Sequence, residues 1–155
     1  MTASHFHPAA LTTLHLPVET HAPEHTVAAA HAFAADVRAG DVIALVGPLG
    51  SGKTVFARGM IARLAGAQDQ FQGSPTFALV QEYHCPAFPL YHFDFFRIKS
   101  AQELLAIGWH EYCTDASVCI VEWADRFPEL LPPHAQWLAF SAGSGTLRRI
   151  QRRPA

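Results

Sequence analysis

The clearest chemical pattern in this sequence is a glycine-rich stretch of eight residues. Residues 47–54, GPLGSGKT, match the spacing G-x-x-x-x-G-K-[ST] in full. Glycines in such a phosphate-binding loop (P-loop) let backbone N–H groups point at phosphate oxygens, and the N-terminus of the following helix adds a positive dipole. We expect Lys53 to reach the β- and γ-phosphates and the Thr54 hydroxyl to ligate Mg²⁺. The predicted nucleotide contacts are Gly47, Leu49, Gly50, Ser51, Gly52, Lys53, Thr54 and Val55.

Two acidic residues follow apolar runs and complete the predicted catalytic set with Lys53. Glu122 comes directly after the buried run Val118–Val121, where a P-loop protein needs a second carboxylate to hold Mg²⁺, in part through water. Asp94 could orient the attacking water or support the metal. An ion pair with Arg97 or the capping of a following helix are its structural alternatives. His92 shares a strand face with Asp94 by the two-residue period, as either a packed histidine or a ligand.

The segment Ser74-Pro75-Thr76-Phe77 precedes a predicted strand and carries two hydroxyl groups. The hydroxyls of Ser74 and Thr76 could sense the γ-phosphate, although Ser-Pro turns are common and the signal is weak alone. No arginine occupies an obvious position to stabilise phosphoryl transfer. We therefore expect low activity of the isolated protein, raised by a partner that orders this loop.

The elements that must position these residues alternate between strands and helices. This alternation predicts a single-domain α/β P-loop NTPase, with a mostly parallel central sheet flanked by helices and antiparallel strands at the edge. The predicted strands are Asp41–Val46, Thr76–Tyr83, Leu90–Phe96, Val118–Val121 and a hairpin of Ala135–Ser141 with Thr146–Gln151, with a short strand around Thr12–Leu16. The predicted helices are Thr26 to about Ala39, Lys53 to Gly66, Ser100–Ile107 and a short one that Pro128 ends.

Length and charge limit the class of protein. The 155 residues suit one domain at 12–151, between a flexible N-terminal segment 1–11 and a C-terminal tail 152–155. Four arginines fall in the last eight residues, and the rest of the chain has 7 basic against 13 acidic residues. That balance argues against a generally basic, nucleic-acid-binding surface. The arginine cluster is either a solvated tail or a local contact to nucleic acid.

Cellular location is predicted from apolar runs and cysteines. No apolar run approaches the ~18 residues of a membrane span, and the N-terminus lacks the pattern of a signal peptide. The 3 cysteines are odd in number and unpatterned, which favours the reducing cytoplasm. We expect a cytoplasmic protein that does not enter a membrane.

The base preference and reaction class follow from what the sequence lacks. The chain has no Asn, no Thr-Lys pair and no D-x-x-G, so a guanine-reading element is unsupported and ATP is the expected nucleotide. A small-molecule or nucleoside kinase is the alternative, because Asp94 and Arg97 could form an acceptor site. The body arginines are scattered, however, rather than gathered in a lid. A nucleotide-switched binding module without turnover is a third reading.

Four elements in this order resemble one known family. They are the P-loop 47–54, the segment 74–83, the element His92–Arg97 and the run Glu122–Arg126. Together they resemble the TsaE family (also called YjeE), and the resemblance covers roughly residues 12–151. The family often has Tyr where this chain has Phe96, and Asp where it has Pro48. The loss of the hydroxyl at Phe96 removes a possible contact at the partner face.

The resemblance implies a Mg-dependent ATPase of bacterial tRNA threonylcarbamoyladenosine biosynthesis. It implies ATP and Mg²⁺ as cofactors and the proteins TsaB and TsaD as partners, with tRNA reached indirectly through the complex. In the family TsaD transfers threonylcarbamoyl to the adenosine next to the anticodon, and ATP hydrolysis by TsaE supports turnover. Carried over by motif, Lys53 and Thr54 take phosphate and Mg²⁺, and Glu122 matches the Walker-B-like acid. Trp123 follows that acid, either as a nucleotide-site residue or as a cap on the core.

Overall fold

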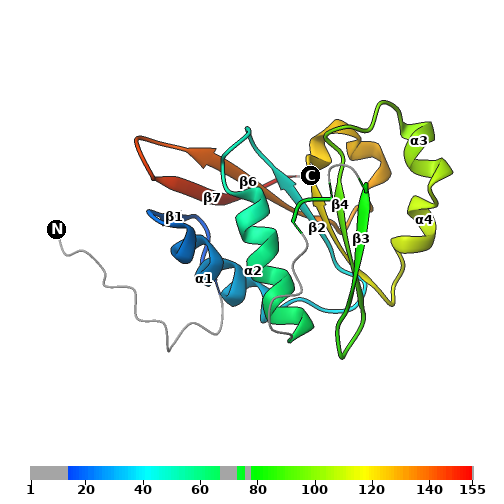
Figure 1. Cartoon of the computed structure of the whole chain (residues 1–155), viewed down its shortest axis with the longest axis horizontal. Coiled ribbons are helices and arrows are strands. Elements are labelled where there is room, and N and C mark those ends of the chain that lie inside the picture. The colour runs from blue at the N-terminus through cyan, green and yellow to red at the C-terminus, as the bar shows by residue number, and fades with distance from the viewer. Residues whose placement is uncertain (1–13, 67–72, 76–77, 155) are drawn as a thin grey trace.

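The computed structural model describes residues 14–66, 73–75 and 78–154 (Figure 1). Within them, one seven-stranded sheet has the order β1-β7-β6-β2-β5-β4-β3. The central strands β6, β2, β5 and β4 are parallel, whereas β7 and β3 pair antiparallel with β6 and β4, and β1 pairs antiparallel with β7. This confirms the predicted fold class. The strands are β1 Val18–Thr20, β2 Val42–Val46, β3 Val80–His84, β4 Pro89–Asp94, β5 Val118–Glu122, β6 Gln136–Ala142 and β7 Arg148–Arg153.

Helices cover both faces of the sheet and enclose two apolar cores. On one face, α1 (Pro23–Ala34) and α2 (Lys53–Ala65) pack on Ile43, Leu45 and Ile120. On the other, α3 (Ala101–Ala106), α4 (Trp109–Tyr112) and the 3₁₀ turns η1 (Ala124–Arg126) and η2 (Pro128–Leu130) accompany an aromatic core around Trp109. The strands β2 and β5 are buried along their whole length, since both faces are covered.

The two helices of the first face approach closely at Gly59. A Cβ atom at Gly59 would lie 2.7 Å from the Cβ of Ala30, closer than side chains can pack. A glycine here therefore lets α2 rest directly on α1. Because α2 begins with Lys53, this packing helps to fix the helix that carries the P-loop residues.

Several element boundaries differ from the predictions. The helix α1 begins at Pro23 rather than at a Thr26 cap, because proline suits the first helical position. Thr26 instead lies inside the helix, with its hydroxyl 2.8 Å from that of Thr20. The helix ends at Ala34, before the predicted Ala39, and a turn follows in which Arg38 N donates to Asp41. The first strand is β1, later than the predicted Thr12–Leu16, of which residues 12 and 13 lie outside the described residues.

The strands that flank the site also differ at their ends. β3 begins at Val80, because Leu79 forms a turn with φ +66° and its N–H donates to Pro75 O. Thr76 and Phe77 lie outside the described residues. β4 ends at Asp94, two residues before the predicted Phe96. β7 extends through Arg153, two residues past the predicted domain end at 151, so the clustered arginines are strand residues.

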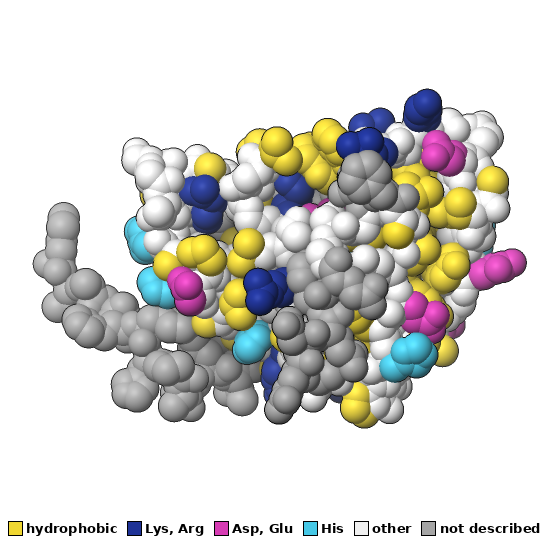
Figure 2. Space-filling model, viewed as in Figure 1, with side chains coloured by type: hydrophobic (Ala, Val, Ile, Leu, Met, Phe, Trp, Pro, Cys, Tyr) yellow, Lys and Arg dark blue, Asp and Glu magenta, His cyan; other side chains and the backbone are white. Residues whose placement is uncertain are grey.

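Surface properties agree with the local distribution of charge. On the face shown in Figure 2, Lys and Arg side chains of the described residues are dispersed among hydrophobic and acidic ones. The helices in the described part of the chain are all too short or too polar to cross a lipid bilayer.

Candidate nucleotide-binding site

The P-loop connects the buried strand β2 to the first residue of α2, as the motif predicts. Gly52 precedes the helix with φ +103°, and Gly47 has φ +146°. A Cβ atom at Gly47 would lie 2.4 Å from the carbonyl oxygen of Phe140. Both glycines are therefore required by backbone conformation, and that at Gly47 also by the close approach of β6.

Lys53 lies inside the site rather than in solvent. Only 4% of the residue is exposed, and Nζ donates to the carbonyl oxygens of Gly47 (2.6 Å) and Pro48 (2.9 Å). Its ammonium also lies 4.2 Å from the ring centroid of Trp123. Burial lowers the pKa of Lys53, and the nearby acids Glu122, Asp125 and Asp94 act in the opposite direction. The lysine is thus held at the mouth of the loop by neutral oxygens and by an aromatic face.

Glu122 is fixed by two side chains from other elements. Thr54 Oγ1, in the first turn of α2, donates to Glu122 Oε1 at 2.5 Å. His92 Nε2 on β4 lies 2.7 Å from Glu122 Oε2, and both side chains are buried. A carboxylate only accepts, so His92 donates to it. The structure thus places the two predicted Mg²⁺ ligands in direct contact, and it shows His92 as the group that orients one of them.

Asp94 ends β4 beside Glu122 but has different partners. In the parallel ladder the two acids lie opposite each other. Asp94 Oδ1 accepts from the N–H of Phe96 at 2.9 Å, and Oδ2 accepts from Ser74 Oγ at 2.7 Å. Asp94 therefore stabilises the turn after its own strand. Through Ser74 it also tethers the segment that precedes residues 76 and 77.

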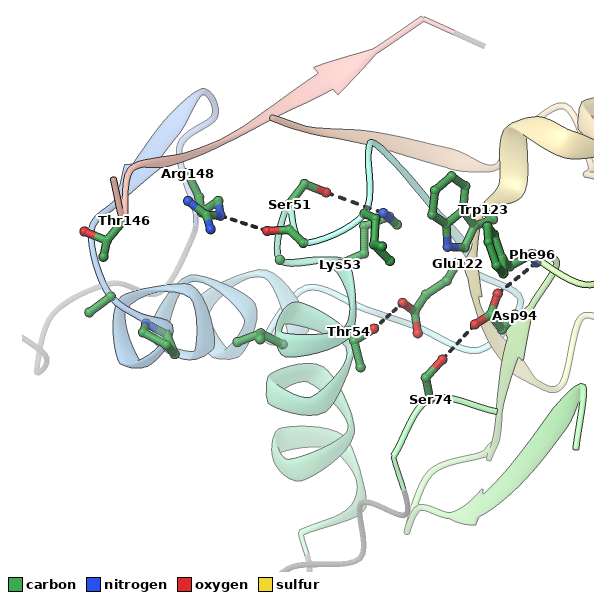
Figure 3. A pocket seen from close by; sticks show the side chains of 16 residues that line it. Ser51, Lys53, Thr54, Ser74, Asp94, Phe96, Glu122, Trp123, Thr146 and Arg148 are labelled. Carbon is green, nitrogen blue, oxygen red and sulfur yellow. Dashed lines mark hydrogen bonds between the residues drawn. The ribbon is translucent and has the colours of Figure 1, made fainter. Parts of the chain in front are cut away.

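These groups surround one cavity of about 490 Å³, within the range of small-molecule sites (Figure 3). Every predicted site residue lines it except Gly47, whose carbonyl binds Lys53, and Thr76, which lies outside the described residues. The cavity is lined by Ala22, Pro23, Leu49, Gly50, Ser51, Gly52, Lys53, Thr54, Val55, Ser74, Asp94, Phe96, Glu122, Trp123, Thr146 and Arg148.

Trp123 lies at this cavity in a backbone conformation rare for a bulky residue. Its φ of +57° falls in the left-handed region, at a cost of about 1–3 kcal/mol. Its ring contacts that of Phe96, with centroids 4.9 Å apart, and Phe96 is 43% exposed. The strained backbone places the indole over the Lys53 ammonium. Trp123 therefore belongs to the rim of the cavity as well as to the edge of the core.

Arg148 is the main lining residue that the sequence did not identify. It belongs to β7, 94 residues after Thr54, yet its Nε donates to Gly50 O at 3.0 Å. The terminal arginine cluster was visible in the sequence, but no local motif links a late strand to an early loop. The pairing of β7 with β6, next to β2, brings them together.

The oxygen donors at this site fit Mg²⁺. Within the described residues no group of three or more His, Cys, Asp and Glu side chains is arranged to hold a metal. Mg²⁺ ordinarily uses one or two protein oxygens, with water and substrate phosphates supplying the remainder. The Thr54 hydroxyl and the Glu122 carboxylate are hard oxygen donors, already in contact at the N-terminus of the P-loop helix.

Comparisons with known proteins identify the family. The family described as threonylcarbamoyl adenosine biosynthesis protein TsaE matches residues 20–150. The tRNA threonylcarbamoyladenosine biosynthesis protein TsaE of Bacillus subtilis (strain 168) is 42% identical over 110 residues, which are 71% of this chain and 67% of that protein. The protein of the same name from Rickettsia prowazekii (strain Madrid E) is 38% identical over 65% of this chain and 69% of its own.

A solved structure agrees with the sequence comparisons. The crystal structure of YdiB from Bacillus subtilis superimposes with a TM-score of 0.72 at 33% identity, covering 88% of this chain and 83% of that one. The matched region includes the P-loop, both strand-end acids and most of β7. The chain belongs to the TsaE family of tRNA threonylcarbamoyladenosine biosynthesis proteins.

Proposed function

We propose that this chain binds and hydrolyses Mg-ATP on the P-loop, in support of threonylcarbamoyl modification of the tRNA adenosine next to the anticodon. It acts on the TsaB–TsaD complex and reaches tRNA only through that complex. One observation carries the ATPase proposal: Lys53, Thr54 and Glu122, from the P-loop, its helix and the end of β5, converge in one cavity. The family gives the pathway. The 3 free cysteines favour action in the cytoplasm.

The residues of the site divide the work between charge and position. Lys53 supplies a compact positive charge for the phosphates, and the backbone N–H groups of the loop supply further donors. Thr54 and Glu122 would hold Mg²⁺, which when bound neutralises charge on the β- and γ-phosphate oxygens. His92 keeps Glu122 turned toward Thr54. Asp94 faces the same space and orients the attacking water, while Ser74 links it to the adjoining segment.

The arginines support weak activity in isolation. Arg148 is the arginine among the described lining residues, and it lies on the opposite side of the P-loop from Asp94 (Figure 3). Arg126 donates to the carbonyl oxygens of Phe96 and Ile98, which ties it to the turn after β4. Neither is placed to stabilise the charge that develops on the γ-phosphate. A partner that docks over Phe96 and Trp123 is the proposed source of the additional catalytic groups.

The test is the rate of phosphate release from ATP by the purified chain, alone and with TsaB–TsaD. We expect slow release alone and a rise of tenfold or more with the complex, where an added catalytic group contributes at least about 1.4 kcal/mol. Lys53→Ala, with phosphate binding removed, serves as the inactive control. Equal rates in both conditions would contradict the dependence on the complex. Transfer of phosphate to a small acceptor in place of water would favour the kinase alternative.

A further inference from the structure

The cavity has a second end that the phosphate chemistry does not use. Lys53, Thr54 and Glu122 form one end. Thr146 and Arg148 lie on the other side of the P-loop, away from Asp94 and Ser74 (Figure 3). Thr20 of β1 pairs with Arg148 of β7, so the chain that continues from β1 into Ala22 and Pro23 reaches the same end. This second end therefore combines small apolar groups with one hydroxyl and one guanidinium.

Arg148 is held there by backbone oxygens. Its Nε donates to Gly50 O at 3.0 Å, and its Nη1 donates to Gly145 O (3.1 Å) and Leu147 O (2.9 Å). Among the described residues, no carboxylate forms an ion pair with it. A guanidinium has five N–H donors on a rigid plane, so these bonds fix its edge while the flat faces and Nη2 are left for a ligand. Gly50 presents no side chain, and a Cβ there would meet nothing within 4 Å.

We propose that this end is the subsite for the nucleotide base, and that Arg148 binds the base by stacking its guanidinium plane on the purine ring. The proposal rests on the proposed function, because the phosphates must lie on the P-loop. The carboxylates of Glu122 and Asp94 mark the γ-phosphate end, so an extended nucleoside triphosphate directs its base to the opposite end. Arginine stacks on aromatic faces, and such contacts tolerate different ring substituents. Ala22 and Pro23 supply apolar surface beside the ring.

The test compares two ligands that share phosphates and differ in the base. Isothermal titration calorimetry measures the dissociation constants of ATP and inorganic tripolyphosphate for the wild-type chain, Arg148→Ala and Arg148→Lys, with Mg²⁺ present. We expect both variants to bind ATP about tenfold more weakly, the loss of about one stacked cation–π contact. Tripolyphosphate affinity should change by less than about twofold in both variants, since phosphate contacts are preserved. The matched control is Arg149→Ala, whose exposed side chain lies 3.8 Å from Glu19 on β1.

Each contrary result has a distinct meaning. Equal losses for ATP and tripolyphosphate would show that Arg148 only clamps the loop through Gly50, and would overturn the base subsite. Unchanged ATP binding in Arg148→Ala would overturn it as well, and full affinity in Arg148→Lys would replace stacking by simple charge. Failure of the wild-type chain to bind either ligand would contradict the proposed function itself. Normal binding by the wild-type chain with unaffected Arg148 variants would contradict the subsite alone.

Discussion

Glu122 and Asp94 end neighbouring parallel strands, lie opposite each other in the ladder and are both buried, yet they are held in different ways. The oxygens of Glu122 contact side chains from α2 and β4, so its position depends on three separate elements. Asp94 accepts from the backbone two residues along its own chain and from Ser74. The first acid is therefore coupled to the phosphate loop, and the second to the turn after β4 and the segment at Ser74.

This difference indicates separate roles for two acids that the sequence could not distinguish. An acid that shares a hydrogen bond with Thr54 is suited to join it on a metal ion. An acid that already stabilises a turn can report on that turn, because any movement of Ser74 changes the environment of its carboxylate. The predictions below test this division.

The largest effect is expected for Glu122→Gln. The amide keeps the shape and can still accept from Thr54, but it removes the negative charge that holds Mg²⁺. We expect the Mg²⁺-dependent turnover number for ATP to fall about 100-fold or more, from the loss of several kcal/mol of charge stabilisation. Steady-state phosphate release measures the change, with the exposed Glu129→Gln as control. Turnover at the wild-type level would remove Glu122 from the site.

His92→Leu should weaken Mg²⁺ use through Glu122. The substitution leaves Glu122 Oε2 buried without its donor, which costs about 1–3 kcal/mol of stability. We expect the Mg²⁺ concentration for half-maximal activity to rise about 10–100-fold, as for other residues that orient a metal ligand. His92→Gln keeps a donor and should restore much of the Mg²⁺ response. A loss of stability with an unchanged Mg²⁺ requirement would mean that His92 only packs.

Asp94→Asn separates the structural role of Asp94 from its chemical role. Asparagine can accept from Phe96 N and can hydrogen-bond Ser74, so the melting temperature should change by less than about 3 °C. We expect turnover to fall about tenfold, since a positioned carboxylate near the reacting water is lost. Thermal unfolding and turnover are measured on the same preparation. Unchanged turnover would reduce Asp94 to a residue that stabilises its turn.

The smallest effect is expected for Ser74→Ala. The variant removes one hydrogen bond to the Asp94 carboxylate, worth about 1.5–3 kcal/mol in a buried setting and less where water can replace it. We expect turnover with TsaB–TsaD to fall about threefold, with ATP affinity unchanged. The exposed Ser144→Ala is the matched control. A larger loss than in Asp94→Asn would mean that Ser74 contacts the nucleotide directly.

The sequence predicted the parts of this protein that depend on local pattern. The P-loop, its helix and the buried run ending at Glu122 were placed correctly, because each is a short stretch whose residues determine its structure. The cap of α3 was also predicted, and Ser100 accepts from Glu103 N. Glu103 itself reaches the N–H of Lys99. The start of α1 was missed, because Thr26 resembles a cap but is buried against Thr20.

Contacts between distant segments could not be predicted. Arg148 meets Gly50 only because β7 pairs with β6 and β6 with β2, an order that one sequence does not specify. His92 could be read equally as a packed residue or a ligand. Its role was decided by the register that sets β4 beside β5, with Asp94 opposite Glu122 and His92 opposite Ile120.

The most direct test of the whole account measures threonylcarbamoyladenosine in tRNA. Cells depleted of this protein are complemented with the wild-type chain or with Lys53→Ala, and the nucleosides of their purified tRNA are quantified by mass spectrometry. We expect the wild-type chain to restore the modified nucleoside and Lys53→Ala, expressed at an equal level, to leave it depleted. Normal threonylcarbamoyladenosine with Lys53→Ala would contradict the claim that the P-loop of this chain supports tRNA modification.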